Sequence, residues 1–143
     1  MTCFYYVDFK KFYDYNGLME NKYVIGDEDF RPWGHWRTID CGDGFVVKRI
    51  TVNSGAILSL QNHKHRNEHW TIVQGLGYVT LGKDVTPLNI GECISIPALM
   101  WHRIENRGDV PLVFIEVQTG DILDENDIVR IEDKYGRSSP CVN

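Results

Sequence analysis

Beyond residue 30, short runs of β-branched and aromatic residues alternate with glycine, asparagine and proline. The runs are FVVKRITV (45–52), AILSL (56–60), WTIVQG (70–75), GYVTL (77–81), CISIP (93–97), HRIEN (102–106) and PLVFIEV (111–117). This rhythm is typical of an all-β sandwich or barrel. Convincing helical periodicity is absent from the middle of the sequence. Candidates for helical turns are residues 8–20 and the tail segment ENDIVRIEDKYG (125–136).

Length and composition predict one domain. The chain has 143 residues, of which 43% are hydrophobic, and this is enough for one substantial core but not for two ordinary domains. Residues 1–27 are rich in Phe and Tyr and too apolar for a solvated linker. We therefore expect an N-terminal extension (1–27) that packs on the barrel or on a partner subunit, followed by the barrel domain (28–143).

Charge and cysteine content limit the classes of partner and the cellular compartment that we expect. A formal net charge of −5 disfavours a nucleic-acid binder or a coat for anionic lipid, so a small-molecule partner is expected. Asp8, Lys10 and Lys11 interrupt the N-terminal apolar run, and no run approaches transmembrane length, so neither signal peptide nor membrane span is expected. Four scattered cysteines without a CxxC pair predict free thiols in a reducing cytoplasm: Cys3, Cys41, Cys93 and Cys141.

The segment LSLQNHKHRNEHW (58–70) holds three of the five histidines. Alternate residues of a strand share a face, so Gln61, His63 and His65 are predicted to point the same way. Glu68 has the opposite parity and joins them only if the chain turns at KHRN and returns as a neighbouring strand. Any one of these residues alone is better explained as an ordinary polar side chain. Their concentration instead suggests a metal site.

A second segment, GECISIPALMWHRIEN (91–106), ends a strand at Pro97 and places His102 at the start of the next. The spacing Gly55-x5-Gln61-x-His63-x4-Glu68-x6-Gly75 resembles the first cupin motif, with glutamine where its first histidine stands. The spacing Gly91-x5-Pro97-x4-His102-x3-Asn106 resembles the second, with Leu99 in place of its inner glycine. The resemblance implies a single-domain cupin, that is, a double-stranded β-helix or jelly-roll barrel. Because Leu99 replaces a turn glycine, we expect a different backbone path before His102.

From about residue 29 to 137 the chain is similar to the C-terminal domain of type II phosphomannose isomerases. The likeness is carried by five segments: RPWG (31–34), VVKRITVNSG (46–55), LSLQNHKHRNEHW (58–70), HRIENRGDVPLVFIEVQTG (102–120) and DENDIVRIEDKYGR (124–137). The resemblance implies interconversion of mannose 6-phosphate and fructose 6-phosphate through a cis-enediol. Guanylyltransferase activity is not expected, because the chain has no glycine-rich nucleotide-binding loop and lacks the length for a nucleotidyltransferase domain.

The same resemblance implies the metal ligands Gln61, His63, Glu68 and His102. A competing frame pairs His63 with His65 but leaves only two residues before Glu68. Two imidazoles, a carboxylate and an amide oxygen suit a divalent Zn, Mn, Fe, Co or Ni ion. Few protein ligands leave coordination positions open, as a catalytic site requires.

Isomerisation also requires a base and a positive charge for the phosphate. Arg66 occupies the arginine of the family signature Q-x-H-x-H-R-x-E-H-W, Arg103 follows a ligand directly, and Lys48 is a candidate for holding a hydroxyl or phosphate. The base is left open among three residues, with His65 as our hypothesis because it has no assigned ligand role and imidazole side chains commonly act as bases. These three residues are His65, Glu68 and Glu116.

Other residues near the motifs receive structural interpretations. We interpret Lys64 and Arg107 as solvated surface charges, and His69 as structural because it points away from the face of Glu68. Trp70 is either part of the pocket or part of the core.

Two rival functions remain at this stage. One is another isomerase or epimerase acting on a sugar phosphate or nucleotide sugar, and the other is a non-catalytic, metal-containing sugar-binding cupin. By family resemblance, a homodimer is also expected.

Overall fold

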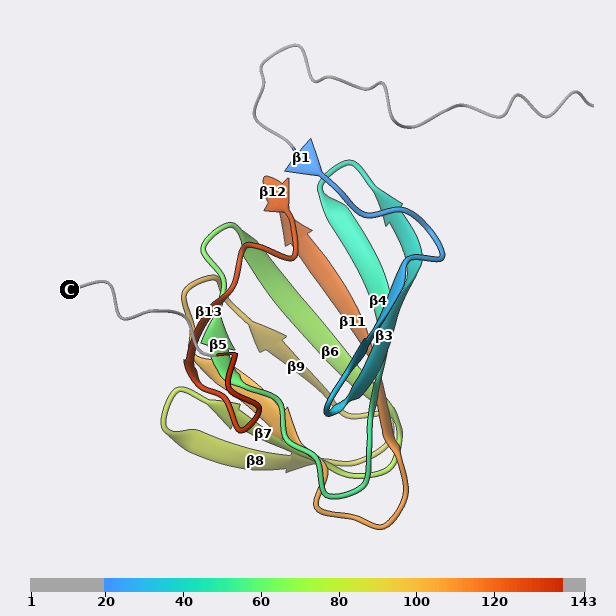
Figure 1. Cartoon of the computed structure of the whole chain (residues 1–143), viewed down its shortest axis with the longest axis vertical. Coiled ribbons are helices and arrows are strands. Elements are labelled where there is room, and N and C mark those ends of the chain that lie inside the picture. The colour runs from blue at the N-terminus through green and yellow to red at the C-terminus, as the bar shows by residue number, and fades with distance from the viewer. Residues whose placement is uncertain (1–19, 138–143) are drawn as a thin grey trace, which may run out of the picture.

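Residues 20–137 are described by the computed structural model of the chain, and within them it is built from strands and loops without helices. The all-β prediction is confirmed. Two sheets face each other and enclose the interior of the domain (Figure 1). The strands are β1 (Glu20–Asn21), β2 (Glu28–Arg31), β3 (Gly34–Gly42), β4 (Phe45–Val52), β5 (Leu60–Asn62), β6 (Arg66–Gln74), β7 (Gly77–Leu81), β8 (Asp84–Leu88), β9 (Cys93–Ile96), β10 (His102–Glu105), β11 (Leu112–Gly120), β12 (Ile122–Leu123) and β13 (Val129–Glu132).

The larger sheet has six strands in the order β2-β3-β4-β11-β6-β9, and the smaller has five in the order β13-β5-β10-β7-β8. Consecutive β5 and β6 belong to different sheets. The prediction that they are paired neighbours is therefore wrong, because the turn between them carries the chain from one sheet to the other.

Alternation along β4 shows how the sequence selects its inner face. Val46, Ile50 and Val52 are buried, and Lys48 is buried in the same inward row. Burying each such aliphatic side chain contributes about 1.5–3 kcal/mol, so the row fixes the register of the strand. A lysine in this row marks the place where the core gives way to a polar pocket.

The C-terminal segment is a strand, and its predicted helical turns are not present. β13 pairs antiparallel with β5, with an irregularity between Arg130 and Glu132. β-Branched Val129 and Ile131 favour the extended backbone, and the free edge of β5 supplies hydrogen-bond partners that a short isolated helix would lack. The other helix candidate, 8–20, lies outside the described residues except for Glu20, which starts β1.

The predicted N-terminal extension is described from Glu20 on, and residues 1–19 lie outside the described residues. β1 pairs in parallel with β12. Tyr23 belongs to the hydrophobic core and packs edge-on against Trp36, with 6.1 Å between the ring centroids. The described part of the extension thus contacts the barrel.

Several described strands lie outside the predicted runs, β3 and β8 among them, and one predicted run is largely irregular. β3 mixes polar and apolar residues, and β8 contains Pro87, which is tolerated because β8 pairs only with β7 at the sheet edge. In the run 56–60, only Leu60 belongs to a strand, although Ile57 forms an isolated bridge to Glu105.

The turn before His102 contains the one described non-glycine residue with positive φ. Leu99 has φ of 67°, the left-handed conformation that glycine favours. Its side chain is 64% exposed, and its backbone N–H donates to the carbonyl of His63 over 2.7 Å. Leucine thus adopts a left-handed conformation at the position where the resemblance expects glycine.

The described part of the chain contains no helix of the length and apolarity needed to cross a membrane.

Candidate metal centre and pocket

Side chains from both sheets converge on one buried point inside the barrel. In the smaller sheet, His102 on β10 lies directly opposite Gln61 on β5. In the larger sheet, Glu68 on β6 lies opposite Gln118 on β11. Directly opposed residues of antiparallel strands share a face, so both rows point into the interior. His63, in the turn after β5, completes the group.

His63, Glu68 and His102 form a compact cluster of potential metal ligands. Nε2 of His63 lies 3.1 Å from Oε1 of Glu68, and Nε2 of His102 lies 3.3 Å from Oε2 of the same carboxylate. One ligand atom from each residue lies within 4.8 Å of the others. The three residues are 2%, 3% and 1% exposed. The structure thus brings together three of the four predicted ligands.

Backbone carbonyls orient both imidazoles. Nδ1 of His63 donates to the carbonyl oxygen of Asp127 over 2.6 Å, and Nδ1 of His102 donates to that of Met100 over 2.8 Å. Because a carbonyl only accepts, each ring carries its proton on Nδ1 when it is neutral. The lone pair of each Nε2 is then directed at the cluster, and this is the arrangement that metal-binding histidines use.

The buried atoms fit a divalent ion. Nε2 of His102 has no well-aligned hydrogen-bond partner within the part of the chain described, although it is fully buried. A buried polar atom without such a partner is costly, and metal coordination would satisfy it. Two imidazole nitrogens and a carboxylate are donors for borderline divalent ions. The structure thus contains a buried site that could bind a metal ion, as predicted.

The cluster keeps its carboxylate ionised. Burial alone would raise the pKa of Glu68, but the neighbouring His63 and Arg66 lower it well below its usual range. Burial likewise opposes the charge on His102, yet the Glu68 carboxylate raises the pKa of that imidazole. A fixed negative charge therefore lies at the centre of the cluster.

Arg66 is buried beside the cluster. Its Nε donates to Oε1 of Glu68 over 2.9 Å, and its Nη1 donates to the carbonyl oxygen of Asp124 over 3.1 Å. Its Nη2 also lies 3.3 Å from Nε2 of His63. Gly120 lies opposite Arg66, and a Cβ there would come within 2.0 Å of the His65 carbonyl oxygen. Close approach of the two strands at glycine therefore sets the position of the guanidinium group.

Gln61, the fourth predicted ligand, lines the same pocket. Its Oε1 accepts a hydrogen bond from the hydroxyl of Ser59 over 2.9 Å. Because Gln61 lies directly opposite His102 on the neighbouring strand, its amide is adjacent to the histidines. Its ligand role stays a prediction.

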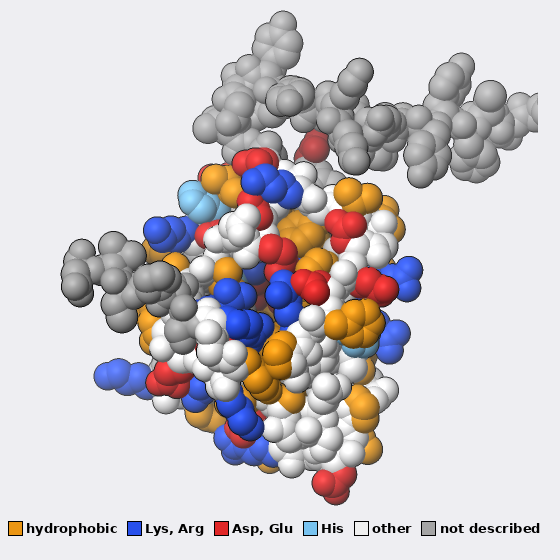
Figure 2. Space-filling view, in the orientation of Figure 1, with side chains coloured by type: hydrophobic (Ala, Val, Ile, Leu, Met, Phe, Trp, Pro, Cys, Tyr) orange, Lys and Arg blue, Asp and Glu red, His pale blue; other side chains and the backbone are white. Residues whose placement is uncertain are grey.

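A pocket opens from the cluster towards the surface, and its charged lining is mainly cationic. Figure 2 shows Lys and Arg side chains gathered in a hollow near the centre of this face. The lining includes the tryptophan trio Trp33, Trp36 and Trp70. Five cations and three carboxylates line it: Arg31, Lys48, Arg66, Arg130, Arg137, Glu68, Glu116 and Glu125. The charged side chains of the lining thus have a positive sum, although the whole chain has a net negative charge.

Lys48, predicted as a substrate contact, lies in an aromatic cage within this pocket. Its Nζ is 4.0 Å from the ring centroids of both Tyr23 and Trp36. The same ammonium pairs with Glu125, which also accepts a hydrogen bond from the Tyr23 hydroxyl. Although burial opposes ionisation, Lys48 lowers the pKa of Glu125. The two rings and Glu125 thus hold the Lys48 ammonium in place.

Glu116 is the second buried carboxylate of the pocket. Its Oε2 accepts from the indole N–H of Trp70 over 2.9 Å, and its Oε1 accepts from the amide of Gln118 over 2.6 Å. Burial, followed by the negative charge of Glu68, raises the pKa of Glu116 to about 7. This carboxyl group can therefore take up or release a proton near neutral pH.

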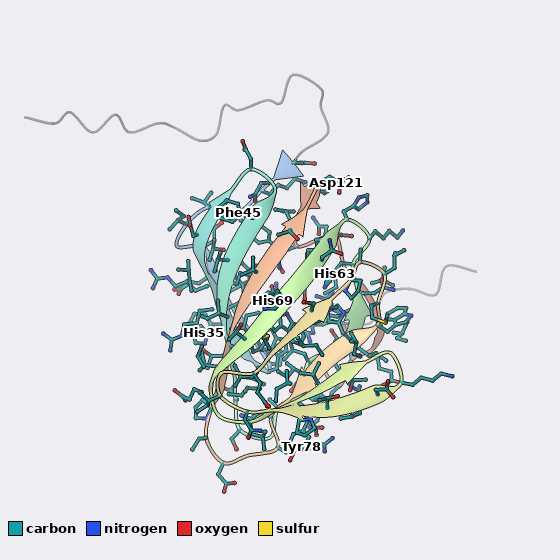
Figure 3. All side chains as sticks on the ribbon, turned by 180° about the vertical axis from the view of Figure 1, so that it is seen from behind. His35, Phe45, His63, His69, Tyr78 and Asp121 are labelled. Carbon is teal, nitrogen blue, oxygen red and sulfur yellow. The ribbon has the colours of Figure 1, made fainter. Side chains whose placement is uncertain are left out.

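Two other predicted residues lie away from the cluster. His65 is exposed, and its Nδ1 is 3.5 Å from a carboxylate oxygen of Asp121. Arg103 forms an ion pair with Glu132 at 3.0 Å, also outside the pocket lining. His69 lies on the outer face of β6, as Figure 3 shows from behind, and its ring contacts the hydroxyl of Ser95.

Trp70 fulfils both of the roles considered from the sequence. It is buried in the core, with its ring centroid 4.8 Å from that of Phe114, and it also lines the pocket. Its indole N–H lies 3.2 Å from Oε2 of Glu68 as well as contacting Glu116.

Sequence reasoning missed several charged residues of the lining. Arg31 lies at the end of β2, and the others lie in or beside the tail segment, where helical turns were expected. A signal for Arg31 was present in RPWG, which carries part of the family resemblance. A similar signal was present in DENDIVRIEDKYGR (124–137), which also carries part of the resemblance and contains Glu125, Arg130 and Arg137.

Comparison of the sequence with protein families shows a match to the model described as mannose-6-phosphate isomerase C-terminal, over residues 19–133. The chain is 52% identical over 109 residues to the xanthan biosynthesis protein XanB of Xanthomonas campestris, covering 76% of this chain and 23% of that protein. It is 49% identical over 117 residues to mannose-1-phosphate guanylyltransferase of Escherichia coli K12, covering 82% and 24%. The chain thus spans about a quarter of the length of these relatives.

Comparison of the structure with solved structures confirms the cupin fold. The cupin domain of Schizosaccharomyces pombe Cnp3 matches with a TM-score of 0.58 and 17% identity, covering 61% of this chain and 64% of that one. The capsular polysaccharide assembling protein CapF of Staphylococcus aureus matches with a TM-score of 0.62 and 22% identity, covering 74% and 34%. These likenesses concern the fold alone.

Proposed function

The chain belongs to the mannose-6-phosphate isomerase C-terminal family, and from this premise we propose that it interconverts mannose 6-phosphate and fructose 6-phosphate. The observation that carries the proposal is the shared pocket: Glu68 of the metal-capable cluster, a second buried carboxylate and five cations line one cavity. A sugar phosphate presents hydroxyl and carbonyl oxygens at one end and a dianion at the other. The pocket offers matching chemistry for both.

The proposed metal ligands are His63, Glu68 and His102, with Gln61 beside them. These residues would hold a divalent ion, which would supply Lewis-acid chemistry at the carbonyl group of the open-chain sugar. The chain contributes the orientation of the donors, through the two backbone carbonyls that hold the imidazoles. It also excludes water, because all three ligands are buried.

We assign proton transfer between C1 and C2 to Glu116. Its carboxylate lies in the pocket and is held by two donors, Trp70 and Gln118. A pKa of about 7 suits a group that must accept a proton from one carbon and return it to the next. His65, the base suggested by the sequence, remains the alternative that mutation must decide.

Lys48 and Arg66 provide the fixed positive charge near the reacting carbons. Arg66 is anchored to Glu68, and Lys48 to Glu125, so neither side chain needs to reorganise when substrate enters. Preorganised cations of this kind stabilise negative charge that develops on sugar oxygens during enolisation. Arg103 lies outside the pocket lining and has no assigned contact in this scheme.

A coupled assay tests the proposal directly. Purified protein is stripped with chelator, reloaded with Zn, Mn, Fe, Co or Ni, and supplied with mannose 6-phosphate while fructose 6-phosphate is detected. We expect metal-dependent turnover that disappears in a His63→Ala/His102→Ala variant. Folded, metal-loaded protein without turnover would contradict the proposal. Turnover of a different sugar phosphate in a parallel panel would favour the rival isomerase or epimerase.

We further propose a cytoplasmic enzyme of polysaccharide precursor synthesis that acts as a homodimer. Two relatives are described as a xanthan and an alginate biosynthesis protein, which supports the pathway class. Cys41 and Cys93 are free thiols within the described residues, and the other two predicted free thiols, Cys3 and Cys141, lie outside them. Light scattering coupled to gel filtration measures the assembly state.

A further inference from the structure

We propose that Arg31, Arg130 and Arg137 form an anion subsite at the mouth of the pocket, which binds the phosphate group of the substrate. The inference rests on the proposed function, since it names the part of the site that holds one end of a sugar phosphate. It concerns a different set of residues from the metal-capable cluster.

The three arginines come from separate parts of the sequence and meet in one place. Arg31 ends β2, Arg130 lies in β13, and Arg137 follows the turn after β13. All three line the pocket that also contains Glu68. All three are partly buried, so their guanidinium groups face the cavity without being sealed from solvent.

The strand register places this group beside the metal-capable cluster but apart from it. Arg130 lies opposite Gln61, and Gln61 lies opposite His102. These three residues therefore form one row across β13, β5 and β10, with their side chains on the same face. With strand spacings of roughly 5 Å, the backbones of Arg130 and His102 are about 10 Å apart. An extended sugar phosphate placed along this row has its carbonyl near the histidines and its phosphate near the arginines.

The charges around the arginines leave room for an anion. Asp29 pairs with Arg31 at 2.6 Å, and Asp133 pairs with Arg137 at 2.8 Å. Each aspartate orients a guanidinium from one side. Partial burial lowers the pKa of Arg130, and the positive charges of Arg137 and Arg31 lower it further. Mutual repulsion among the three cations is relieved when a dianion lies between them.

Arginine chemistry favours phosphate over a neutral sugar at this position. A guanidinium presents a planar fork of N–H donors that matches two phosphate oxygens at once. Lys48 and Arg66 are buried and pair with Glu125 and Glu68 deeper in the pocket, whereas the three mouth arginines are only partly buried. The two groups of cations therefore have different roles: the buried cations act near the sugar carbons, and the mouth arginines hold the phosphate.

Binding measurements test the subsite independently of turnover. Calorimetry compares mannose 6-phosphate, inorganic phosphate and mannose on chelator-treated protein, for the wild type and for Arg31→Gln and Arg130→Gln. Arg107→Gln is the matched control, because Arg107 pairs with Glu105 outside the pocket. Each pocket variant is expected to weaken binding of mannose 6-phosphate and inorganic phosphate about tenfold, as the loss of a charge-assisted hydrogen bond predicts. The control is expected to bind as the wild type does.

Wild-type affinity for both phosphates in Arg31→Gln and Arg130→Gln, with folding checked by circular dichroism, would overturn the subsite. Equal weakening in Arg107→Gln would also overturn it, because the effect would then be one of overall charge. Arg130→Lys guards against a folding defect, since it keeps the charge and loses only the fork. It is expected to retain part of the affinity for both phosphates, and wild-type affinity in a folded Arg130→Lys variant would overturn the role of the fork.

The outcome separates this inference from the proposed isomerase activity. If the wild type binds mannose 6-phosphate through the arginines but does not isomerise it, the subsite stands and the proposed function fails. If the wild type isomerises it and the arginine variants keep the wild-type KM, the function stands and the subsite fails.

Discussion

The two ends of the pocket are built in different ways. The metal-capable end is formed by fully buried side chains whose polar atoms are fixed by backbone carbonyls or by each other. The arginine end lies where the free edge of one sheet, β2, approaches that of the other, β13. Sheet interiors are rigid, whereas edges and the loops beyond them accept change. A site of this design keeps its chemistry constant and allows its specificity to vary at the rim.

The largest effect is expected at the buried end, from Glu68→Gln. An amide is a poor metal ligand and leaves Arg66 without its counter-charge. Metal content, measured by inductively coupled plasma mass spectrometry, should fall at least about a hundredfold, and turnover should fall to background. His69→Ala is the control, because His69 faces outward from the next position of the same strand. Normal metal loading of Glu68→Gln would remove this residue from the ligand set.

Glu116→Gln should keep the metal and lose the chemistry. Loss of a general base predicts a decrease of about 10²–10⁴-fold in kcat. Burial and Glu68 raise the pKa of Glu116 to about 7, while Lys48 and Arg66 oppose that rise. Because the base acts in its ionised form, wild-type kcat should fall as pH decreases through this pKa.

A pH–rate profile of wild type and Glu116→Gln, between about pH 5.5 and 9, tests the assignment. The acidic limb should be present in the wild type and absent from the residual activity of the variant. An unchanged profile in the variant would transfer the base to another group.

Arginine replacements compare the stability of the two ends. Arg66→Met leaves a buried carboxylate unpaired and should reduce the free energy of unfolding by about 3–5 kcal/mol in urea titrations of metal-free protein. Arg31→Met removes a partly exposed pair with Asp29 and should cost at most about 1 kcal/mol. An equal loss of unfolding free energy in the two variants would show that the two ends do not differ in rigidity.

Leu99→Gly examines the loop that precedes His102. Leu99 has φ of 67°, and relief of this left-handed strain should outweigh the greater backbone freedom of glycine in the unfolded chain. We expect the free energy of unfolding to increase by about 0.5–1 kcal/mol. A decrease would indicate that the exposed leucine side chain makes contacts that matter more than its backbone conformation.

The smallest effect is expected for His65→Ala. Its side chain is exposed beside Asp121, outside both ends of the pocket. If Glu116 is the base, kcat should change by no more than about twofold. A large loss, with metal content unchanged, would restore His65 as the proton-transfer residue.

The sequence was sufficient for the centre of the site and insufficient for its rim. His63, Glu68 and His102 were predicted because their spacing resembles that of the two cupin motifs. Arg130 and Arg137 lie in a segment that carries the family resemblance, but their place in the pocket was missed because it depends on the long-range pairing of β13 with β5. His65 appeared equivalent to His63 by parity, but the chain leaves β5 at Asn62 and so ends that alternation.

Asp127 links the metal-capable cluster to the segment just before β13 through hydrogen bonds. Its carbonyl holds the ring of His63, and its carboxylate accepts hydrogen bonds from the backbone N–H groups of Lys64 and His65 at 2.9 and 3.0 Å. Opening of this segment therefore frees the imidazole to rotate, so metal release and local unfolding are linked equilibria. Each tenfold rise in free metal above its dissociation constant adds about 1.4 kcal/mol against that opening. Protection of the segment from proteolysis would consequently report metal occupancy.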